Sequence, residues 1–589
     1  AGQAVILARA ATMPAVRPLP PKGELAAALA EAGARPHDGG EWILDARELG
    51  PTDLISVVRA VLDETDGGRL RIVTAGAQPV PGDDADAIDP DQAALWGLAR
   101  CFALEHPDRW GGILDVARTS SSCEVARQVV REIEGGGVED QVVRRGEARL
   151  LPRLVSFVPE ATGSADLRAG SYLVTGGLGG LGPVVAEWLA ARGATHLVLV
   201  GRTASPDHLD PAAREMVDRL EAAGVRVTIR AVDVTDREAL TRLVDDLRAG
   251  AEPLRGVVHA AAVFDSAPVA DATAAHLDAV LGPKVSGARK LLRAVESDDL
   301  DFILFFSSTT SILGVAELGA YAAANQVLDA LAARARSEGV PVTAIGWGIW
   351  DEMRLAGDEE RERYARVGLR PMRSGAALDA LGSVLSGDGA HTVLADVDWT
   401  RLRDVYESRR VRPLLAELGR REMSEVGLGE GGGAAAGASG EPEVRRADLH
   451  ALDPEDRLER IARAVEAEVR AVLRLSDDHP VDTGLGFFEM GMDSLMSVEL
   501  RGRLERALGM RLPSTLAFNY PTIAEASEFI SGRITAAAPE TPKPHEHADT
   551  VEAEVERNAG HADDRPSEEE LGRRLAERLA QLERLEGGR

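Results

Sequence analysis

Short apolar runs alternate with helical patterns from residue 168 to about residue 425, and this rhythm restricts the possible folds more than any other feature of the chain. Strands that alternate with helices are typical of a parallel sheet with helical crossovers. Six such strands predict one doubly wound α/β sheet. The six runs are SYLVTGG, THLVLVGR, VRVTIRAVDV, GVVHAAAV, FILFFSS and VTAIGWG.

A weaker version of the same rhythm occupies the first part of the chain. Strand-like runs and helical patterns alternate there too, but no glycine fingerprint follows any of the runs. The sequence therefore predicts a first α/β half at residues 1–165 and a second at residues 166–425. The runs of the first half are AVILA, WILDA, LRIVTAG and GGILDV, separated by helical patterns such as GELAAALAEAGA and DQAALWGLARCFALE.

The rest of the chain contains helical patterns and polar linkers. Residues 426–453 hold a Gly/Ala-rich stretch that predicts a flexible linker. Residues 454–534 carry apolar positions at helical spacing and no convincing strand, which predicts a small helical bundle. Residues 535–565 are polar and form a second linker, and residues 566–589 predict one short amphipathic helix. The apolar stripe of that helix is Leu571, Leu575, Leu579 and Leu582.

Composition excludes several classes of protein. A length of 589 residues corresponds to three or four domains, and the net charge of −29 repels nucleic acid and anionic lipid over most of the surface. Cys101 and Cys123 cannot form a disulfide framework or a Cys-rich zinc site, and they suit a reducing cytoplasm. No apolar run approaches a membrane span. The N-terminus lacks Met and resembles a cut from a longer chain. We therefore expect a cytoplasmic protein without a metal, nucleic-acid or membrane partner.

A glycine-rich turn between a strand and a helix gives the first functional signal. The segment TGGLGGLG contains Gly177-x-Gly179-x-x-Gly182, which matches the dinucleotide fingerprint in its proper context. The first glycine makes the tight turn, the second lets a pyrophosphate approach the backbone, and the third lets helix and strand pack closely. The alternative is an ordinary tight turn between a strand and a helix.

Charged residues at the ends of the next two strands bear on the choice of cofactor. An acidic residue after the second strand would bind the ribose hydroxyls of NAD, whereas Arg202 favours the extra phosphate of NADP. The sequence therefore favours NADPH over NADH, unless Arg202 is a solvated loop residue. Asp233 and Val234 are candidates for contacts on the adenine side, although Asp233 is equally suited to capping a helix.

A set of polar residues suited to reducing a ketone follows. Ser308 lies at the end of a strand, and Tyr321 and Asn325 share one face of the next helix. Hydride transfer to a ketone makes an alkoxide that needs a proton, which a tyrosine can give more readily when a nearby cation lowers its pKa. A serine hydroxyl can hold the carbonyl oxygen. Taken singly, such a tyrosine is usually a core residue and such a serine a cap.

These motifs resemble the short-chain dehydrogenase/reductase superfamily, whose commonest form has Lys four residues after Tyr. Asn325 stands there instead, and GPKVSGARKLL supplies Lys284 before the serine strand, which resembles the ketoreductase domains of modular polyketide synthases. The resemblance implies that Tyr321 donates the proton, Ser308 orients the carbonyl, Lys284 tunes Tyr321 and Asn325 supports the site. The candidate cofactor-binding residues are Thr175, Gly177, Leu178, Gly179, Gly182, Arg202, Asp233, Val234, Ala260 and Ala261.

The resemblance extends over residues 1–425. It implies that the first half is a truncated, cofactor-free Rossmann-like half that braces the second, NADPH-binding half. The segment HAAAVFDSAPVAD matches the strand beside the nicotinamide, with Ala262 where the family usually has Gly, and IGWGIWDEM matches the start of the substrate lid. Ketoreductases of B-type stereochemistry carry a Leu-Asp-Asp motif, and this chain has Ser266 where the diagnostic second Asp would stand. Ketoreductases of A-type stereochemistry carry a Trp eight residues before the tyrosine, and this chain has Leu313 there. The missing Trp slightly favours B-type stereochemistry.

The segment GMDSL places Ser494 at the start of an amphipathic helix. A helix N-terminus suits a phosphodiester, although a Ser here is also an ordinary cap. The stretch resembles acyl carrier proteins, which implies 4'-phosphopantetheine on Ser494, attached by a phosphopantetheinyl transferase. The helix at residues 566–589 resembles the tails that dock the next polyketide synthase polypeptide; its alternatives are a solvated helix without a partner and a short coiled coil.

The sequence thus predicts NADPH-dependent reduction of a β-ketoacyl thioester on the carrier to a β-hydroxyacyl thioester, which then passes to the next module. Ketosynthase and acyltransferase motifs are absent, so upstream domains must supply the substrate. Two alternatives stay open. The reductase is silent and the chain is a carrier and docking scaffold, or a free-standing short-chain reductase is fused to unrelated helices.

Overall fold

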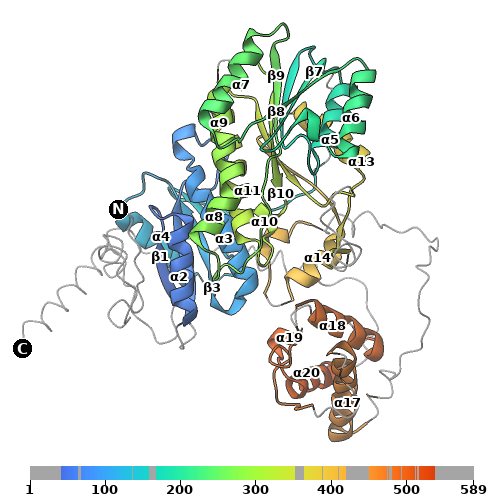
Figure 1. Cartoon of the computed structure of the whole chain (residues 1–589). Coiled ribbons are helices and arrows are strands. Elements are labelled where there is room, and N and C mark those ends of the chain that lie inside the picture. The colour runs from blue at the N-terminus through green and yellow to red at the C-terminus, as the bar shows by residue number, and fades with distance from the viewer. Residues whose placement is uncertain are drawn as a thin grey trace, which may run out of the picture.

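The computed structural model describes residues 41–63, 68–135, 137–157, 167–296, 298–351, 364–365, 367–387, 389–408, 410–418, 452–473, 481–492, 494–510 and 516–536, with a few isolated positions between them. Two α/β halves and a separate helical region follow one another along the chain (Figure 1). The strand AVILA, the first helical pattern, most of both linkers and the helix predicted at residues 566–589 lie outside the described residues.

The first half contains a five-stranded sheet in the order β1-β2-β3-β4-β5. The first four strands are parallel and β5 pairs antiparallel with β4. The sequence predicted β1, β2 and β3; it missed β4 and β5, whose short, Arg-rich segments lack a long apolar run. The strands are β1 (Glu41–Asp45), β2 (Arg69–Ala75), β3 (Trp110–Val116), β4 (Gln141–Arg145) and β5 (Ala148–Leu150), and the helices are α2 (Pro51–Asp63), α3 (Pro90–Glu105) and α4 (Ser122–Glu134).

The second half contains a seven-stranded parallel sheet in the order β13-β11-β10-β9-β6-β7-β8. The six predicted strands are all present, and the prediction of six was one too few because the short, half-buried edge strand β13 was missed. The strands are β6 (Ser171–Thr175), β7 (His196–Gly201), β8 (Arg226–Ala231), β9 (Leu254–His259), β10 (Phe302–Ser308), β11 (Val342–Trp347) and β13 (His391–Leu394).

Helices cover the sheet of the second half and fix the position of its functional residues. Chain order reverses beside β6, since β7 and β8 lie on one side of it and β9 and β10 on the other. In doubly wound sheets, ligands bind at the carboxyl ends of the strands at such a point. The helices are α5 (Gly182–Ala191), α6 (Pro211–Ala222), α7 (Arg237–Ala249), α8 (Ala274–Leu281), α9 (Gly287–Ala294), α10 (Thr310–Leu313), α11 (Gly319–Ser337), α13 (Ser374–Leu385) and α14 (Trp399–Tyr406).

The two halves pack together through α3 and α11. A Cβ atom on Gly97 of α3 would lie 2.5 Å from the backbone of Ala322 on α11, so only glycine permits this close approach. Arg100 is buried at the same interface and donates hydrogen bonds to the carbonyl oxygen of Ser311 and to the side chain of Gln326. The first half therefore holds the helix that carries Tyr321.

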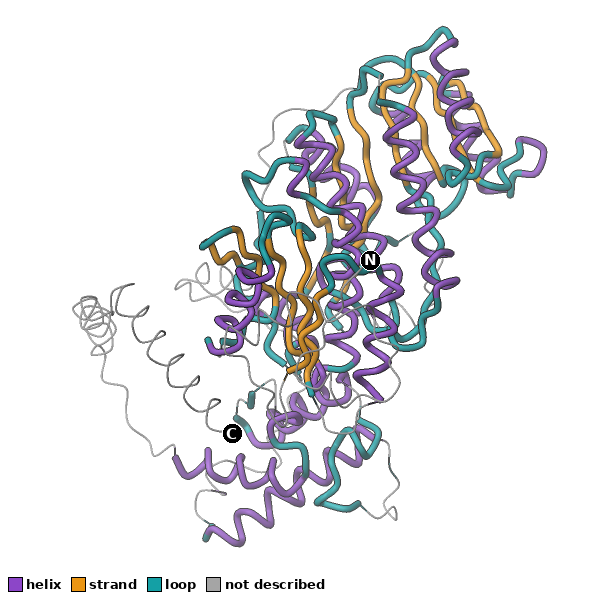
Figure 2. The backbone as a smooth tube through the Cα atoms, turned by 90° about the vertical axis from the view of Figure 1, so that its left-hand side faces the viewer, coloured by secondary structure: helices purple, strands orange, loops and turns teal. Residues whose placement is uncertain are grey.

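The helical region after the linker is a small bundle, as the sequence predicted. Its described residues form helices and loops without a strand, which Figure 2 shows as purple and teal segments below the two halves. Ile461, Leu504 and Ile530 are among the side chains of its own apolar core. The helices are α17 (Pro454–Leu473), α18 (Ser494–Leu508), α19 (Leu516–Asn519) and α20 (Ile523–Ala536).

Candidate active site

A cavity of about 560 Å³ opens at the carboxyl ends of the strands of the second half. It joins the glycine turn after β6 to the polar residues on β10 and α11. Most of the predicted residues line it, whereas Thr175, Gly177, Leu178, Gly182 and Asn325 do not. The predicted residues that line the cavity are Gly179, Arg202, Asp233, Val234, Ala260, Ala261, Lys284, Ser308 and Tyr321.

The glycine turn has two kinds of glycine. A Cβ atom on Gly179 would meet nothing within 4 Å, so the backbone there faces open space in the cavity. A Cβ atom on Gly182 would lie 2.4 Å from the carbonyl oxygen of Gly176, so Gly182 permits close packing inside the turn. Gly176 and Gly180 have positive φ angles of 72° and 52°, which the fingerprint did not single out. The turn therefore leaves room for a phosphate group before the N-terminus of α5.

Arg202 and Asp233 lie on the wall of the cavity at the ends of β7 and β8. The Oδ1 atom of Asp233 accepts hydrogen bonds from the amide and hydroxyl of Thr235, at 2.8 and 2.7 Å. These bonds, with a smaller contribution from Arg202, lower the pKa of Asp233. Asp233 thus stabilises the local turn and also lines the cavity.

His259 is buried behind the cavity and supports the site, a role that sequence reasoning missed. It ends β9, and its Nδ1 atom lies 2.8 Å from the hydroxyl of Thr175. Its Nε2 atom lies 2.9 Å from the carbonyl oxygen of Lys284, so the ring donates there and accepts from Thr175. Burial lowers the pKa of His259 to about 4, which keeps the ring neutral at pH 7. His259 therefore fixes the Lys284 turn to the strand before the glycine turn.

Lys284 reaches the cavity from a π-helical turn between α8 and α9. Its Nζ atom donates to the carbonyl oxygen of Phe306 at 2.6 Å and lies 5.1 Å from the centroid of the Tyr321 ring. Burial lowers the pKa of Lys284 to about 7, and the carboxylate of Asp329 opposes this shift. Lys284 can therefore be charged or neutral near physiological pH.

Tyr321 lies on the first turns of α11, where its ring meets the ring of Phe264 edge-on at a centroid distance of 5.3 Å. Burial raises the pKa of Tyr321, and a hydrogen bond with Asn325 opposes the shift. Its hydroxyl is thus protonated at neutral pH, which is the form that a proton donor needs. That Lys284 lowers the pKa of Tyr321 stays a prediction.

Asn325 lies one turn after Tyr321, as the spacing predicted, but it is fully buried beside the cavity instead of lining it. Its Nδ2 atom donates to the carbonyl oxygen of Tyr321 at 2.8 Å and to the hydroxyl of Thr310 at 3.4 Å. Ser308 is the last residue of β10, and its Oγ accepts from the amide of Thr310 at 3.2 Å. Asn325 and Thr310 therefore link the helix of Tyr321 to the strand of Ser308.

Aromatic residues at the end of β11 and just after it form another wall of the cavity. Trp347 and Trp350 pack edge-on at a centroid distance of 4.7 Å, and both line the cavity with Leu369. The sequence pattern IGWGIW marked this segment, but not the side chains that face the site. The wall is apolar, which suits an acyl chain and excludes water.

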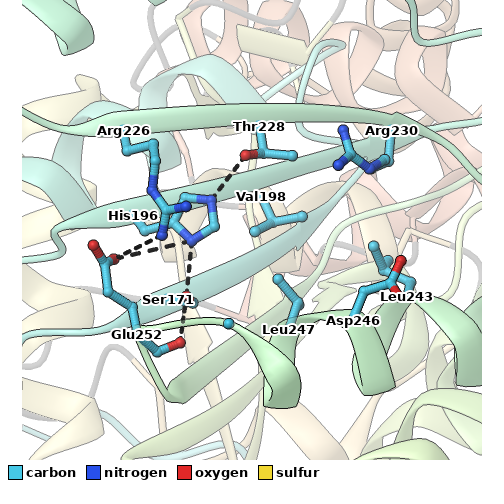
Figure 3. Close-up of a pocket in the computed structure, with 11 residues that line it drawn as sticks. Ser171, His196, Val198, Arg226, Thr228, Arg230, Leu243, Asp246, Leu247 and Glu252 are labelled. Atoms are coloured by element: carbon cyan, nitrogen blue, oxygen red, sulfur yellow. Dashed lines mark hydrogen bonds and ion pairs between the residues drawn. The ribbon is translucent and has the colours of Figure 1, made fainter.

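A second, smaller cavity of about 130 Å³ lies among β6, β7, β8 and α7. Figure 3 shows His196 bridging two hydroxyls, with Nδ1 2.8 Å from Ser171 and Nε2 2.9 Å from Thr228. Arg226 forms an ion pair with Glu252 at 3.4 Å. Several polar groups of this cavity thus partner one another, and none of the predicted site residues lines it.

Ser494 is the first residue of α18, as the sequence predicted, and Gly491, three residues before it, has a positive φ of 91°.

Within the described ranges, no group of three His, Cys, Asp or Glu side chains could hold a metal ion. The helices of those ranges also include none that is long and apolar enough to cross a bilayer.

Three family models match the chain, and together they span both halves and the bundle. The Rossmann fold domain of polyketide synthase extender module SpnB matches residues 5–154. The KR domain matches residues 170–352, and the phosphopantetheine attachment site matches residues 463–530. The last stretch contains Ser494.

Curated relatives are long polyketide synthases. Erythronolide synthase EryA3 of Saccharopolyspora erythraea is 38% identical over 77% of this chain and 14% of its own length. Pikromycin synthase component PikAIII of Streptomyces venezuelae is 35% identical over 83% of this chain and 31% of its own length. Polyketide synthase GfsA of Streptomyces halstedii is 36% identical over 83% of this chain and 6% of its own length. The chain thus spans less than a third of each of these relatives.

Solved ketoreductases share the fold of the two halves. PlmKR1, from the first module of phoslactomycin biosynthesis in Streptomyces sp. HK803, has a TM-score of 0.60 and 33% identity, and the match covers 67% of this chain and 92% of PlmKR1. An A-type ketoreductase from a modular polyketide synthase has a TM-score of 0.59 and 38% identity, with coverage of 66% and 80%. The chain therefore belongs to the modular polyketide synthases, and it carries a ketoreductase followed by a phosphopantetheine attachment domain.

Proposed function

We propose that this ketoreductase uses NADPH to reduce a β-ketoacyl thioester carried on Ser494 to the β-hydroxyacyl thioester. The main support is that Tyr321, Ser308 and Lys284 line one cavity together with the glycine turn. The cavity is large enough for a cofactor and the reacting end of a chain, since ligand sites commonly measure roughly 300–1,000 Å³.

The residues of the turn fit a dinucleotide cofactor. The open space on the cavity side of Gly179 allows a pyrophosphate to approach the backbone. The N-terminus of α5 favours the negative charge of that pyrophosphate. Arg202 lines the same cavity and is the candidate partner of the 2'-phosphate that distinguishes NADPH from NADH. When bound, NADPH supplies the hydride for the carbonyl carbon of the substrate.

Side chains of the cavity supply the proton and orient the ketone. The hydroxyls of Ser308 and Tyr321 donate hydrogen bonds to the carbonyl oxygen. Tyr321 then gives its proton to that oxygen, which is far more basic as an alkoxide than a phenolate is. The charged form of Lys284, 5.1 Å from the ring, stabilises the resulting tyrosinate. Asn325 holds the first turns of α11 in place through its bond to the Tyr321 carbonyl oxygen.

The helical bundle carries the substrate. Phosphopantetheine added to Ser494 by a phosphopantetheinyl transferase tethers the ketone and raises its effective concentration at the ketoreductase. Upstream ketosynthase and acyltransferase domains supply the β-ketoacyl chain, and the product passes to a downstream polypeptide through the helix predicted at residues 566–589. The polar residues that line the cavity do not favour a silent scaffold.

The variant Tyr321→Phe tests the proposal. We expect it to slow reduction of a diffusible β-ketoacyl thioester by at least roughly 100-fold, the usual contribution of a general acid, with NADPH binding unchanged. Tyr520→Phe in the bundle is the control and should reduce at the wild-type rate. Reduction at the wild-type rate by Tyr321→Phe would overturn the role of Tyr321. A wild-type chain without saturable NADPH binding would favour the scaffold.

A further inference from the structure

The carrier bundle contacts the ketoreductase through α18 and α14. Figure 1 shows the bundle beside α14. The guanidinium of Arg501 on α18 binds both carboxylate oxygens of Asp404 on α14, at 3.2 Å and 2.5 Å. The Arg501 side chain is 12% exposed and the Asp404 side chain 33% exposed. A two-pronged pair with this degree of burial fixes orientation more firmly than a single exposed contact does.

Neighbouring arginines on α18 bond within the bundle instead. Arg503 pairs with Glu468 of α17 at 2.6 Å, and Arg506 donates to the carbonyl oxygen of Gly502, one turn earlier. Arg501 is therefore the member of this set of three that reaches the ketoreductase. Its position on the helix selects which face of the bundle meets α14.

The helix α14 is attached to two walls of the active-site cavity. The hydroxyl of Tyr406 donates to the carbonyl oxygen of Gly314 at 2.9 Å, and the next residue, Val315, lines the cavity. The amide of Asp398, which caps α14, donates to the carbonyl oxygen of Gly368 at 2.8 Å, and Leu369 after it also lines the cavity. A partner bound on α14 therefore lies next to the cavity that holds Tyr321.

The attachment residue Ser494 lies on the same helix as Arg501, which contacts the ketoreductase. Ser494 begins α18 seven residues before Arg501, a distance of about 10 Å along the helix axis. We propose that Asp404 and Arg501 form the docking contact through which the carrier presents its bound ketone to the ketoreductase. This proposal rests on the proposed function, because it assigns the surface that delivers the substrate of that reaction.

The test compares tethered and diffusible substrate on the full chain. Chains loaded on Ser494 with a β-ketoacyl pantetheine are mixed with excess NADPH, quenched at intervals and read by mass. The same variants, unloaded, reduce a β-ketoacyl N-acetylcysteamine thioester. We expect Asp404→Arg and Arg501→Glu each to slow reduction of the tethered ketone roughly three- to tenfold, since the tether still holds the carrier nearby. The rate on the diffusible thioester should not change.

The double variant and a control variant make the result specific. Combining Asp404→Arg with Arg501→Glu restores an ion pair and should recover most of the tethered rate. Arg506→Glu alters charge on the same helix and should reduce both substrates at the wild-type rate. Equal rates for all variants on the tethered ketone would overturn the proposal. So would an equal loss on both substrates, or a double variant no faster than the single ones.

A cross-linking assay keeps this proposal separate from the proposed function. Cysteines replace Asp404 and Arg501 in a Cys123→Ser background, because Cys123 is the exposed native thiol. A short bis-maleimide should link them within one chain faster than it links a pair at Asp404 and Arg506, which lies about 140° further around α18. Equal linking of both pairs would contradict the docking contact. If the chain with Asp404→Cys and Arg501→Cys links as expected while the wild type reduces neither thioester, the proposed function alone is contradicted.

Discussion

At the scale of single residues, the proposed reduction depends on how burial sets the protonation state of Lys284. Burial lowers the pKa of Lys284 to about 7, and the charged form is the one that can stabilise a tyrosinate. Because the ammonium loses its proton as pH rises through this pKa, we expect the single-turnover rate of reduction to fall above about pH 7. A rate profile between about pH 6 and pH 9 measures this.

Lys284→Met is the matched variant for the pH profile. It removes the titrating group, so the variant should be slower at neutral pH and should lack the fall near pH 7. Tyr321 does not produce such a fall in this range, because burial raises its pKa above the ordinary value of about 10. A flat wild-type profile, or a fall that persists in Lys284→Met, would contradict the role of Lys284.

Under the proposed function, Arg202 selects NADPH over NADH by meeting the 2'-phosphate. Arg202→Ala removes the guanidinium that the 2'-phosphate would meet, so we expect the preference for NADPH over NADH to drop by roughly tenfold or more. Initial rates with each cofactor give kcat/KM and hence the ratio. Arg214→Ala, at an exposed position of α6, is the control. An unchanged ratio of kcat/KM for NADPH over NADH in Arg202→Ala would show that Arg202 does not bind the 2'-phosphate.

At the scale of elements, two glycines of the turn have different roles: Gly182 allows close packing, and Gly179 leaves room for NADPH. Gly182→Ala places a methyl group 2.4 Å from the carbonyl oxygen of Gly176, so the backbone must shift and we expect a loss of about 1–3 kcal/mol in stability. Gly179→Ala meets nothing within 4 Å, so it should leave the unfolding temperature unchanged and weaken NADPH binding. Thermal unfolding and NADPH titration of both variants check this. Equal unfolding temperatures, or full NADPH affinity in Gly179→Ala, would contradict the distinction.

Elements with a long apolar run were predictable from sequence, and short or polar ones were not. The runs of β6, β7 and β10 are buried along nearly their whole length, so hydrophobicity alone marked them. Strand β13 spans His391–Leu394 at a half-buried edge, where pairing with β11 rather than apolar content makes it a strand.

Some side-chain roles could also be predicted from the sequence, whereas roles that depend on contacts between distant segments could not. Tyr321 could be named because reduction of a ketone needs a proton donor, and Lys284 because GPKVSGARKLL matches the ketoreductase pattern. His259 could not be named, because its role depends on Thr175 and Lys284 meeting it from distant parts of the chain. The prediction that Asn325 shares a face with Tyr321 was right, but its contact with Thr310 depends on how α10 packs, which spacing does not encode.

At the scale of the whole molecule, the first half stabilises the catalytic half through Arg100. This buried guanidinium bonds to Gln141 of its own half and to Ser311 and Gln326 of the other. Arg100→Met leaves those oxygens unsatisfied, so we expect a loss of roughly 2–4 kcal/mol in stability and slower reduction, because α10 and α11 border the cavity. Thermal unfolding and reduction rates measure both effects. Arg118→Met, on an exposed ion pair, is the control, and equal behaviour of the two variants would contradict this role.

Carrier, ketoreductase and cofactor act in one reaction of the whole chain under the proposed function. The most direct measurement is the intact mass of the protein loaded on Ser494 with a β-ketoacyl pantetheine, before and after addition of NADPH. We expect loading at Ser494 followed by a gain of two hydrogens on the acyl group. A chain that loads but never gains those hydrogens, while it binds NADPH and folds normally, would rule out NADPH-dependent reduction of the carrier-bound ketone.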